Sequence, residues 1–547
     1  MADDDPVPSP DIPVEGRQIP FADLLNNIKG KLDQLTEDRA MSADLLFMTT
    51  YMASLALANA SRPEIFSFAA NRKEYISAKY INKVDTYVKK WSYSYSESLS
   101  IVAERATNPI LKSMLNRYAN SIESGVPDED FLKNELATVR SVYRSQIEQG
   151  LEQLKTWGDA YIALLLSGTV IAVTLMISIA IYSPAGIDST LNITYAILFA
   201  IGAGGNFMMY QSVPNDPKSH GLRTHMSKEQ QTIHAMERIM VPLTIVAVIV
   251  LAILGISAGL IFILIGVLLA PMGIIGFIDD SNITMRDNDF SVFIRSLGSV
   301  MGGQGTTAVY AIHTIDKKSL TALEPLVNSV YSKMNLGLDD KQIWGKFIGE
   351  SGSNYIYKYL NIYLDTVTLG GPPDPIGTVV GSSVLEQTLL REKKDMHSRS
   401  FIVLLVPMHM AMASIFVALY RIMVVLTGSV SSMMQNFQNQ TAAATASSSS
   451  GGVSASQALG GMGGGMTGMF TNFPEKEMGA FIVLCLIIIT VSDIIAAKIV
   501  GGGDRYMFYF YTALFCILTG IVLIFIPLAV NMFFSPEGLQ AMGSGVA

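Results

Sequence analysis

Very few ionisable residues lie in or beside the apolar runs of this chain, and three of them are His409, Arg421 and Asp493. Asp493 lies seven residues before Val500, and His409 lies nine residues after Ser400. At ~1.5 Å per residue their depths in two antiparallel helices differ by about 3 Å. A lone carboxylate in hydrocarbon costs at least ~2.5 kcal/mol, so Asp493 needs a partner. We predict that His409 and Asp493 face each other inside a helix bundle.

Two alternatives to this pair stay open at the level of sequence. Lys498 is also close to Asp493, but a spacing of five residues misses the favourable three or four. Asp493 could also stay protonated or reach the inner interface without any partner. A double change of His409 and Asp493 distinguishes the pair from both alternatives.

Residue types that would support catalysis are not arranged in any known constellation. There is no G-x-x-x-x-G-K-[ST] loop, no H-E-x-x-H and no Cys/His cluster. The two cysteines, Cys485 and Cys516, lie in apolar runs and predict neither a disulfide framework nor a metal site. We therefore expect no catalytic residue, no metal, no cofactor and no enzymatic activity. A net charge of −8 also argues against nucleic-acid binding.

Long apolar runs indicate a polytopic membrane protein. Half of the 547 residues are hydrophobic, and only 15% are charged. The 40 residues from Ile239 to Ile278 contain no charge, which is about twice the length that crosses a ~30 Å hydrocarbon layer. They predict a hairpin of two spans that turns near 255–259. Further runs lie near 161–182, 191–210, 400–420, 479–500 and 506–533, which makes seven spans.

The distribution of basic residues predicts the orientation. With the N-terminus in the cytosol, only Arg421 and Lys476 of the 38 basic residues lie at or beyond the outer face. The N-terminus is therefore expected in the cytosol and the C-terminus outside the cell membrane. The expected organisation is a disordered tail (1–20), a first cytosolic helical domain (21–158), transmembrane helices 1–4 (159–278) with a basic cytosolic loop (211–238), a second cytosolic helical domain (279–399), transmembrane helix 5 (400–427), a flexible extracellular Ser/Gly/Met-rich loop (428–477), transmembrane helices 6–7 (478–534) and an extracellular tail (535–547).

The two soluble stretches align without gaps at an offset of 245 residues. Leu115 falls on Leu360, and Asp44 falls on Asp289. Gly125 and Pro127 fall on Gly370 and Pro372, which repeats a helix stop. The match indicates a duplication. The fold class expected is an all-α polytopic membrane protein with two duplicated cytosolic helical bundles and about seven transmembrane helices.

The second soluble stretch resembles a known family. It contains the segments FIRSLGSVMGGQGTTAVYAI, LEPLVNSVYSKMNLGLDDKQIWGKFIGESGS and TLGGPPDPIGTVV, and it enters the membrane at LLVPMHMAM. These segments are similar to the platform proteins that assemble the archaellum (archaeal flagellum), a branch of the type II secretion system F domain and type IV pilus platform family. The similarity covers roughly residues 40–535 and is most specific over 290–410.

What the resemblance implies is a non-enzymatic membrane platform. A separate cytosolic hexameric secretion ATPase would dock on its cytosolic domains. The motion of that ATPase would drive archaellin or pilin-like subunits into the filament and, in archaella, rotate it. A homodimeric platform beneath the hexamer is compatible with the resemblance.

Basic residues near the inner face are the candidates for docking this ATPase. They are Arg223, Lys228, Arg391, Lys393 and Lys394. The alternative interpretation is that they only anchor the protein by the positive-inside rule. On the outer side, Asn439 begins an N-glycosylation sequon, Asn-Gln-Thr, that could equally have arisen by chance.

Three other functions stay open. A platform for an adhesive type IV pilus would have a similar sequence. A transporter with parallel repeats would need polar residues that converge in the bundle. A membrane enzyme would need a catalytic constellation.

Overall fold

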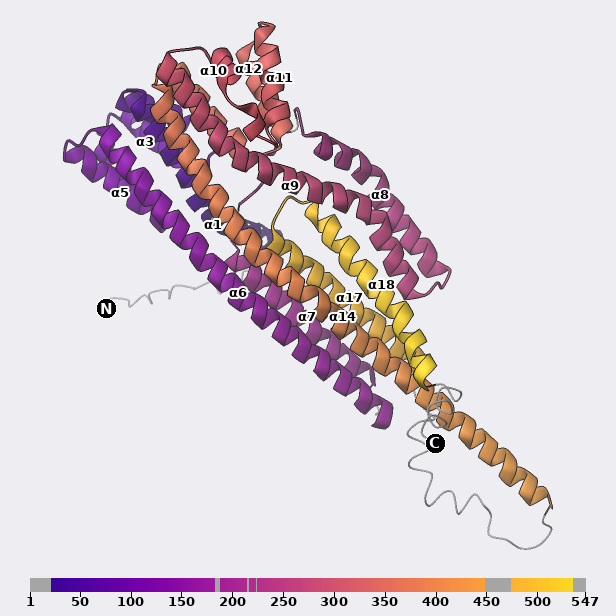
Figure 1. Ribbon diagram of the computed structural model, residues 1–547. Helices are drawn as coiled ribbons and strands as arrows, with labels where there is room; N and C mark the ends of the chain where they lie inside the picture. The colour runs from indigo at the N-terminus through magenta and orange to yellow at the C-terminus, as the bar shows by residue number, and fades with distance from the viewer. Residues whose placement is uncertain (1–20, 183–186, 214–215, 223, 448–473, 535–547) are drawn as a thin grey trace, which may run out of the picture.

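The structure, a computed structural model, describes residues 21–182, 187–213, 216–222, 224–447 and 474–534. Helices make up almost all of this part of the chain, and its one β-type contact is an isolated antiparallel bridge between Ser219 and Ser353. Figure 1 shows an elongated molecule in which three helices run from one end toward the other. They are α6 (Asp128–Tyr182), α9 (Ala258–Gln304) and α14 (Pro373–Ser447).

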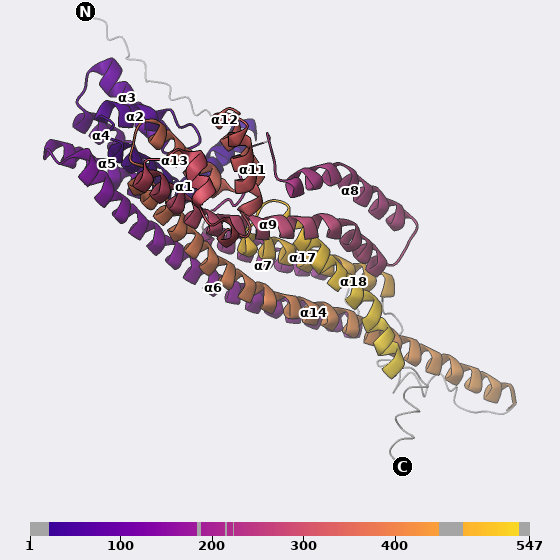
Figure 2. The ribbon, with the colours of Figure 1, turned by 45° about the horizontal axis from the view of Figure 1, so that its top comes forward.

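Short helices gather at one end of these long helices (Figures 1 and 2). The first group follows α1 (Phe21–Leu57) and comprises α2 (Arg62–Ala70), α3 (Ala78–Trp91), α4 (Tyr95–Glu104) and α5 (Pro109–Glu123). The second follows α9 and comprises α10 (Ala308–Thr314), the 3₁₀ turn η1 (Lys317–Ser319), α11 (Glu324–Asn335), α12 (Asp340–Ser351) and α13 (Asn354–Thr368).

The apolar helices lie toward the other end. They are α7 (Ile187–Ser212), α8 (Lys228–Ile253), α17 (Glu475–Gly501) and α18 (Met507–Phe534), together with parts of α6, α9 and α14. Helices α8 and α9 form a hairpin that turns between Ile253 and Ala258, where the uncharged run predicts it. The all-α polytopic fold expected from the sequence is confirmed.

Eight helices of the described residues are long and apolar enough to cross a membrane. The extra one relative to the sequence prediction is Ala40–Leu57, the second half of α1, and 78% of its apolar window is buried in the protein. The window in α8 is only 6% buried. Because a span that faces lipid leaves apolar surface uncovered, we assign Ala40–Leu57 to the core of the first bundle and seven helices to the membrane.

The duplication extends to the helix boundaries. Adding the offset of 245 to the bounds of α5, 109 and 123, gives 354 and 368, the bounds of α13. Adding it to the first residue of α6, 128, gives 373, where α14 begins. The glycines that end α5 and α13, Gly125 and Gly370, both have positive φ angles, 72° and 91°. The two bundles are therefore copies of one structural unit.

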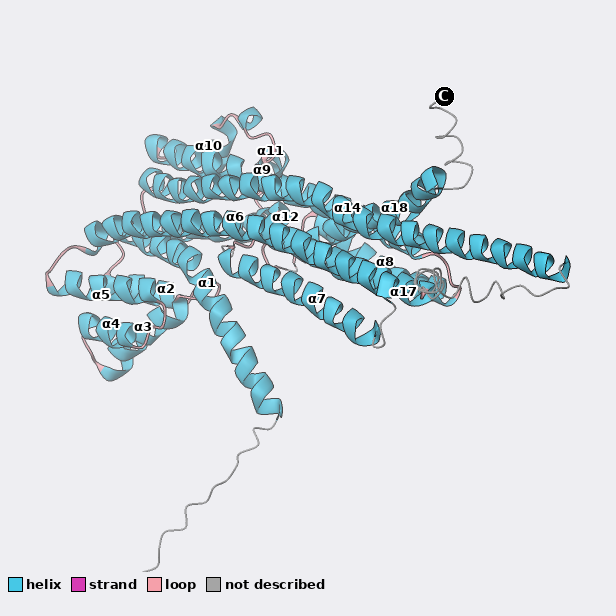
Figure 3. Ribbon diagram, turned by 90° about the horizontal axis from the view of Figure 1, so that it is seen from below, coloured by secondary structure: helices cyan, strands magenta, loops and turns pink. Residues whose placement is uncertain are grey.

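Two boundaries differ from the sequence prediction. Helix α14 continues to Ser447 and projects beyond the other helices (Figure 3), so the flexible loop expected from residue 428 was placed too early. Residues 429–447 contain neither glycine nor proline, the two residues that most disfavour a helix. The basic loop expected over 211–238 is also shorter, because α7 ends at Ser212 and α8 begins at Lys228.

Glycines allow α9 and α18 to pack closely. A Cβ atom added to Gly273 would lie 2.6 Å from the Cα atom of Phe510, and one added to Gly266 would lie 2.9 Å from the carbonyl oxygen of Ala513. These neighbours are backbone atoms, which cannot rotate away. Small residues at such crossings are how helices approach one another in a membrane, where lipid offers no hydrophobic driving force.

Candidate functional site

His409 and Asp493 lie in contact within the apolar bundle. The Nδ1 atom of His409 is 2.7 Å from Oδ2 of Asp493, and both side chains are fully buried. One proton must lie between these two atoms, since neither can donate without it. Lys498, the competing partner, instead donates to the carbonyl oxygens of Gly502 and Gly503 at 2.6 and 3.0 Å.

Further polar groups complete this contact. Tyr161 donates its hydroxyl to Oδ1 of Asp493 at 2.7 Å, so both carboxylate oxygens have a partner. The Nε2 atom of His409 lies 2.9 Å from the hydroxyl of Thr519. Asn206 donates to the backbone and side-chain oxygens of Ser492 at 3.0 and 3.1 Å. The hydroxyl of Thr490 lies 2.9 Å from that of Thr519. We call the following residues the intramembrane polar cluster: Tyr161, Asn206, His409, Thr490, Ser492, Asp493 and Thr519.

The intramembrane polar cluster connects five helices: α6, α7, α14, α17 and α18. Sequence reasoning found only His409 and Asp493, because it considered ionisable residues alone. The usable signal for the others is that Tyr, Asn, Ser and Thr interrupt their apolar runs. The third ionisable residue, Arg421, is not part of the cluster and donates to Asn531 at 2.8 Å.

A second network lies around Arg391, nearer the short helices. Arg391 forms a two-pronged ion pair with Asp216, at 2.7 and 3.0 Å, and a further bond of 2.5 Å to Asp287. Its guanidinium also lies 3.8 Å from the ring centre of Tyr355. Burial alone would raise the pKa of Asp216, but the charge and hydrogen bonds of Arg391 outweigh burial and hold that pKa below its ordinary value.

The five docking candidates lie in different environments. Arg391 and Lys394 are buried, with 3% and 8% of their surface exposed, so neither can meet a partner in this conformation. Lys393 is half exposed and pairs with Glu148 at 2.6 Å, while Lys228 is exposed at the start of α8. Arg223 lies outside the described residues. Positive-inside counting cannot separate these cases, because it weighs buried and exposed charges alike.

Only the backbone of Asn439 is described, within α14, so the environment of its side chain lies outside the described residues. Glycosylation at this position stays a prediction, and mass spectrometry of the peptide that contains it would check it.

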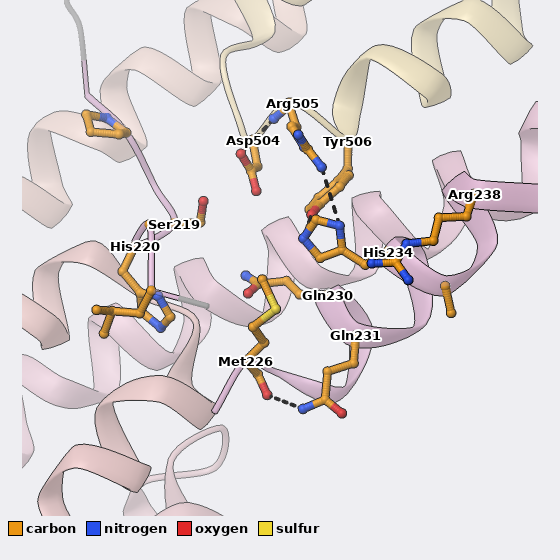
Figure 4. Close-up of a pocket in the computed structure, with 14 residues that line it drawn as sticks. Ser219, His220, Met226, Gln230, Gln231, His234, Arg238, Asp504, Arg505 and Tyr506 are labelled. Carbon is orange, nitrogen blue, oxygen red and sulfur yellow. Dashed lines mark hydrogen bonds between the residues drawn. The ribbon is translucent and has the colours of Figure 1, made fainter. Parts of the chain in front are cut away.

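An open cavity of about 820 Å³ lies where α8 and α18 begin (Figure 4). Its lining comes from the segment before α8, from the first turns of α8 and from the connection between α17 and α18. His234 and Arg238, one turn apart on α8, face it together with Arg505. The hydroxyl of Tyr506 lies 2.8 Å from Nε2 of His234, which ties α18 to α8.

His220 fixes the segment before α8 to the second bundle. Its Nε2 atom lies 3.2 Å and 3.1 Å from the carbonyl oxygens of Ile348 and Gly349, so Nε2 carries the proton. The other ring nitrogen, Nδ1, is buried without a hydrogen-bond partner among the described residues. Burial lowers the pKa of His220.

These observations define a class: an all-α polytopic membrane protein in which a duplicated helical bundle continues directly into membrane-spanning helices. Within that class, the chain is similar to the flagella accessory protein J of Methanocaldococcus jannaschii, with 21% identity over 370 residues that cover 65% of each chain. It is also similar to the flagella accessory protein J of Methanococcus voltae, with 23% identity over 370 residues and 64% of each chain.

The alignment therefore spans just under two thirds of the length of these curated relatives. No family model and no solved structure matches the chain. The resemblance stated from the sequence is confirmed by the two relatives, which both carry the name flagella accessory protein J.

Proposed function

We propose that this chain is the membrane platform of an archaellum machine, with its N-terminus and both helical bundles in the cytosol. The observation that carries the proposal is its similarity to two flagella accessory proteins J. The continuous helices α6, α9 and α14 support it, because they join the bundles to the membrane without a linker. In this proposal the chain is not an enzyme, and a separate cytosolic hexameric ATPase hydrolyses ATP.

The platform converts the motion of that ATPase into insertion of archaellin subunits, and into rotation of the filament. Docking takes place on the cytosolic bundles and includes the exposed lysines Lys228 and Lys393. Arg391 and Lys394 are left out of the docking surface because they are buried. The contacts of Arg391 instead hold α9, α13 and α14 of the second bundle in register with the segment before α8.

The test is binding of the full-length protein in detergent to the secretion ATPase of the same genome. We expect K228E and K393E to weaken binding in a salt-dependent way, since the contacts are exposed charges. K476E is the matched control, because Lys476 is an exposed lysine on the outer side in the proposed orientation. Unchanged binding by K228E and K393E would leave these lysines with an anchoring role only.

Deletion of the gene tests the assignment itself. Loss of archaella and of swimming, with adhesive pili unaffected, is the expected result. Loss of pili with normal swimming would assign the chain to an adhesive type IV pilus instead, and failure of any ATPase to bind would contradict the platform role.

A further inference from the structure

The cavity in Figure 4 lies at the boundary between water and hydrocarbon. On α8 its last lining residue is Arg238, which immediately precedes the uncharged run that begins at Ile239. On the other side, Tyr506 immediately precedes the apolar helix α18. Both helices therefore enter the membrane directly below this cavity, at the depth where lipid headgroups lie.

The cavity carries positive charge that is available to a ligand. Among the described residues Arg238 forms no ion pair, and its side chain is exposed. Arg505 is 60% exposed and donates to Glu237 at 2.9 Å. Asp504 is the one acidic residue of the lining, and its carboxylate accepts from the backbone amide of Arg505 at 2.7 Å. Glu237 on α8 also lies 3.5 Å from His234, so the charge favours an anion placed beside Arg238 and away from Asp504.

A second cavity of about 400 Å³ lies deeper between α8, α9, α17 and α18, and its lining is apolar. Val248 and Phe508 belong to this lining. Helix α8 therefore lines both cavities, and α18, which lines the deeper one, begins directly after Tyr506 of the first. Along α8, ten residues separate Arg238 from Val248, a distance of about 15 Å. That distance matches the reach from a lipid phosphate into its hydrocarbon chain.

Helix α8 also lacks protein partners over most of its surface. It packs chiefly on α9, and Ile245, Ile249 and Ile253 are 56%, 52% and 80% exposed. Apolar surface of this kind within the membrane is covered by lipid chains, since no water is present there. Helix α8 therefore offers a charged surface that suits a lipid headgroup and an apolar surface that suits a lipid chain.

We propose that the two cavities together bind one anionic membrane lipid. Its phosphate lies against Arg238, with Arg505 at the rim, and its chain lies in the apolar cavity between α8 and α18. Arginine suits this role because its planar guanidinium binds phosphate oxygens in pairs. The lipid would hold α8 against α18, in addition to the contact between His234 and Tyr506. This site is independent of the proposed platform function.

The test uses the purified full-length protein in detergent with three additives: phosphatidylglycerol, phosphatidylcholine and inorganic phosphate. We expect phosphatidylglycerol alone to raise the thermal unfolding midpoint and to remain bound in native mass spectrometry. R238Q/R505Q should weaken this binding about tenfold or more, because two charge-assisted contacts are lost. R399Q is the control, since Arg399 is an exposed arginine that precedes another span.

Equal lipid binding by the wild type and R238Q/R505Q would overturn the proposal. So would an equal effect of inorganic phosphate, which would indicate a site for the free anion. A photoactivatable phosphatidylglycerol on the wild-type protein keeps the test decisive if R238Q/R505Q does not fold. Adducts on peptides of α8 and α18 support the site, and adducts confined to other helices contradict it.

Discussion

Asp44 and Asp289, which are 245 positions apart, accept hydrogen bonds from backbone amides that are also 245 positions apart. Oδ2 of Asp44 accepts from the amide of Ser77 at 2.7 Å, and Oδ2 of Asp289 accepts from the amide of Ala322 at 2.7 Å. In each bundle the carboxylate comes from the long helix, and it fixes the loop before α3 in the first bundle and before α11 in the second. The two halves thus retain the same internal bond although few of their residues are identical.

Replacing either aspartate with alanine should destabilise its bundle. D44A should cost about 1–3 kcal/mol of unfolding free energy, because it strands the buried amide and hydroxyl of Ser77. D289A should cost less, since Asp289 is only partly buried. Thermal unfolding measures both, and E152A, which removes an exposed carboxylate on α6, should change little. Equal effects of D44A and E152A would contradict this prediction.

The buried pair predicts a non-additive mutant cycle. D493L alone should strongly lower abundance and thermal stability, because it leaves His409 and the hydroxyl of Tyr161 without their acceptor. The double variant H409L/D493L should be less damaged than the sum of the single changes predicts. Platform abundance in membranes and unfolding in detergent are the measurements. Additive effects would mean that the contact contributes no coupling energy.

The sequence predicts positions along a helix well, but it does not predict which side chains meet across the bundle. The hairpin turn after Ile253 and the equal depth of His409 and Asp493 follow from counting residues along helices. The partners Tyr161 and Thr519 could not be predicted in this way, because contact across a bundle depends on how each helix is rotated about its axis.

The sequence also could not predict which charged residues are buried and which are exposed. Arg391 and Lys393 are two positions apart on one helix, yet Arg391 is buried against Asp216 and Lys393 is half exposed. Residues two apart in a helix point in very different directions, so proximity in sequence says nothing about a shared surface. Which face of α14 meets the bundle is decided by packing between elements far apart in the chain.

Close packing of α9 on α18 predicts sensitivity to a single methyl group. G273A places a Cβ atom 2.6 Å from the Cα atom of Phe510 and should destabilise the protein by about 1–3 kcal/mol. G204A on α7 is the matched control, because no atom lies within 4 Å of its added Cβ. Its effect should be neutral or stabilising, as alanine favours helix over glycine. The thermal unfolding midpoint of G273A should therefore fall, whereas that of G204A should stay the same or rise.

Acid should loosen the segment before α8. Because burial lowers the pKa of His220 in the folded protein, the unfolded chain takes up its proton at a higher pH. The contribution of His220 is therefore complete above about pH 6.5 and declines as the pH falls below that value. Hydrogen exchange at the amides of His220 and Asn354, which bond to Gly352 and Lys218, measures this from pH 7 to pH 5.

H220F should remove this acid-dependent part of the exchange, although it weakens the contact at neutral pH by losing the bonds to Ile348 and Gly349. H397F is the control, since His397 is exposed on α14. An acid response in H220F that equals the wild type would assign the effect to other groups.

The proposed orientation, with the N-terminus in the cytosol, predicts a labelling pattern. With a membrane-impermeant maleimide on intact cells, S450C should be labelled, whereas S319C in the second bundle should be labelled only after lysis. The native cysteines, Cys485 and Cys516, are buried, so the wild type provides the blank. Labelling of S319C but not of S450C would reverse the topology.

Helix α6 makes the bundle and the membrane part into one lever. Its 55 residues form a continuous rod about 80 Å long, and no proline interrupts it. If such a rod pivots at one end, a tilt of roughly 5° carries the other end through roughly 7 Å, well over one helical turn. A small change in the tilt of α6 at the short helices would therefore produce a displacement of several ångströms at its opposite end, at the far surface of the membrane.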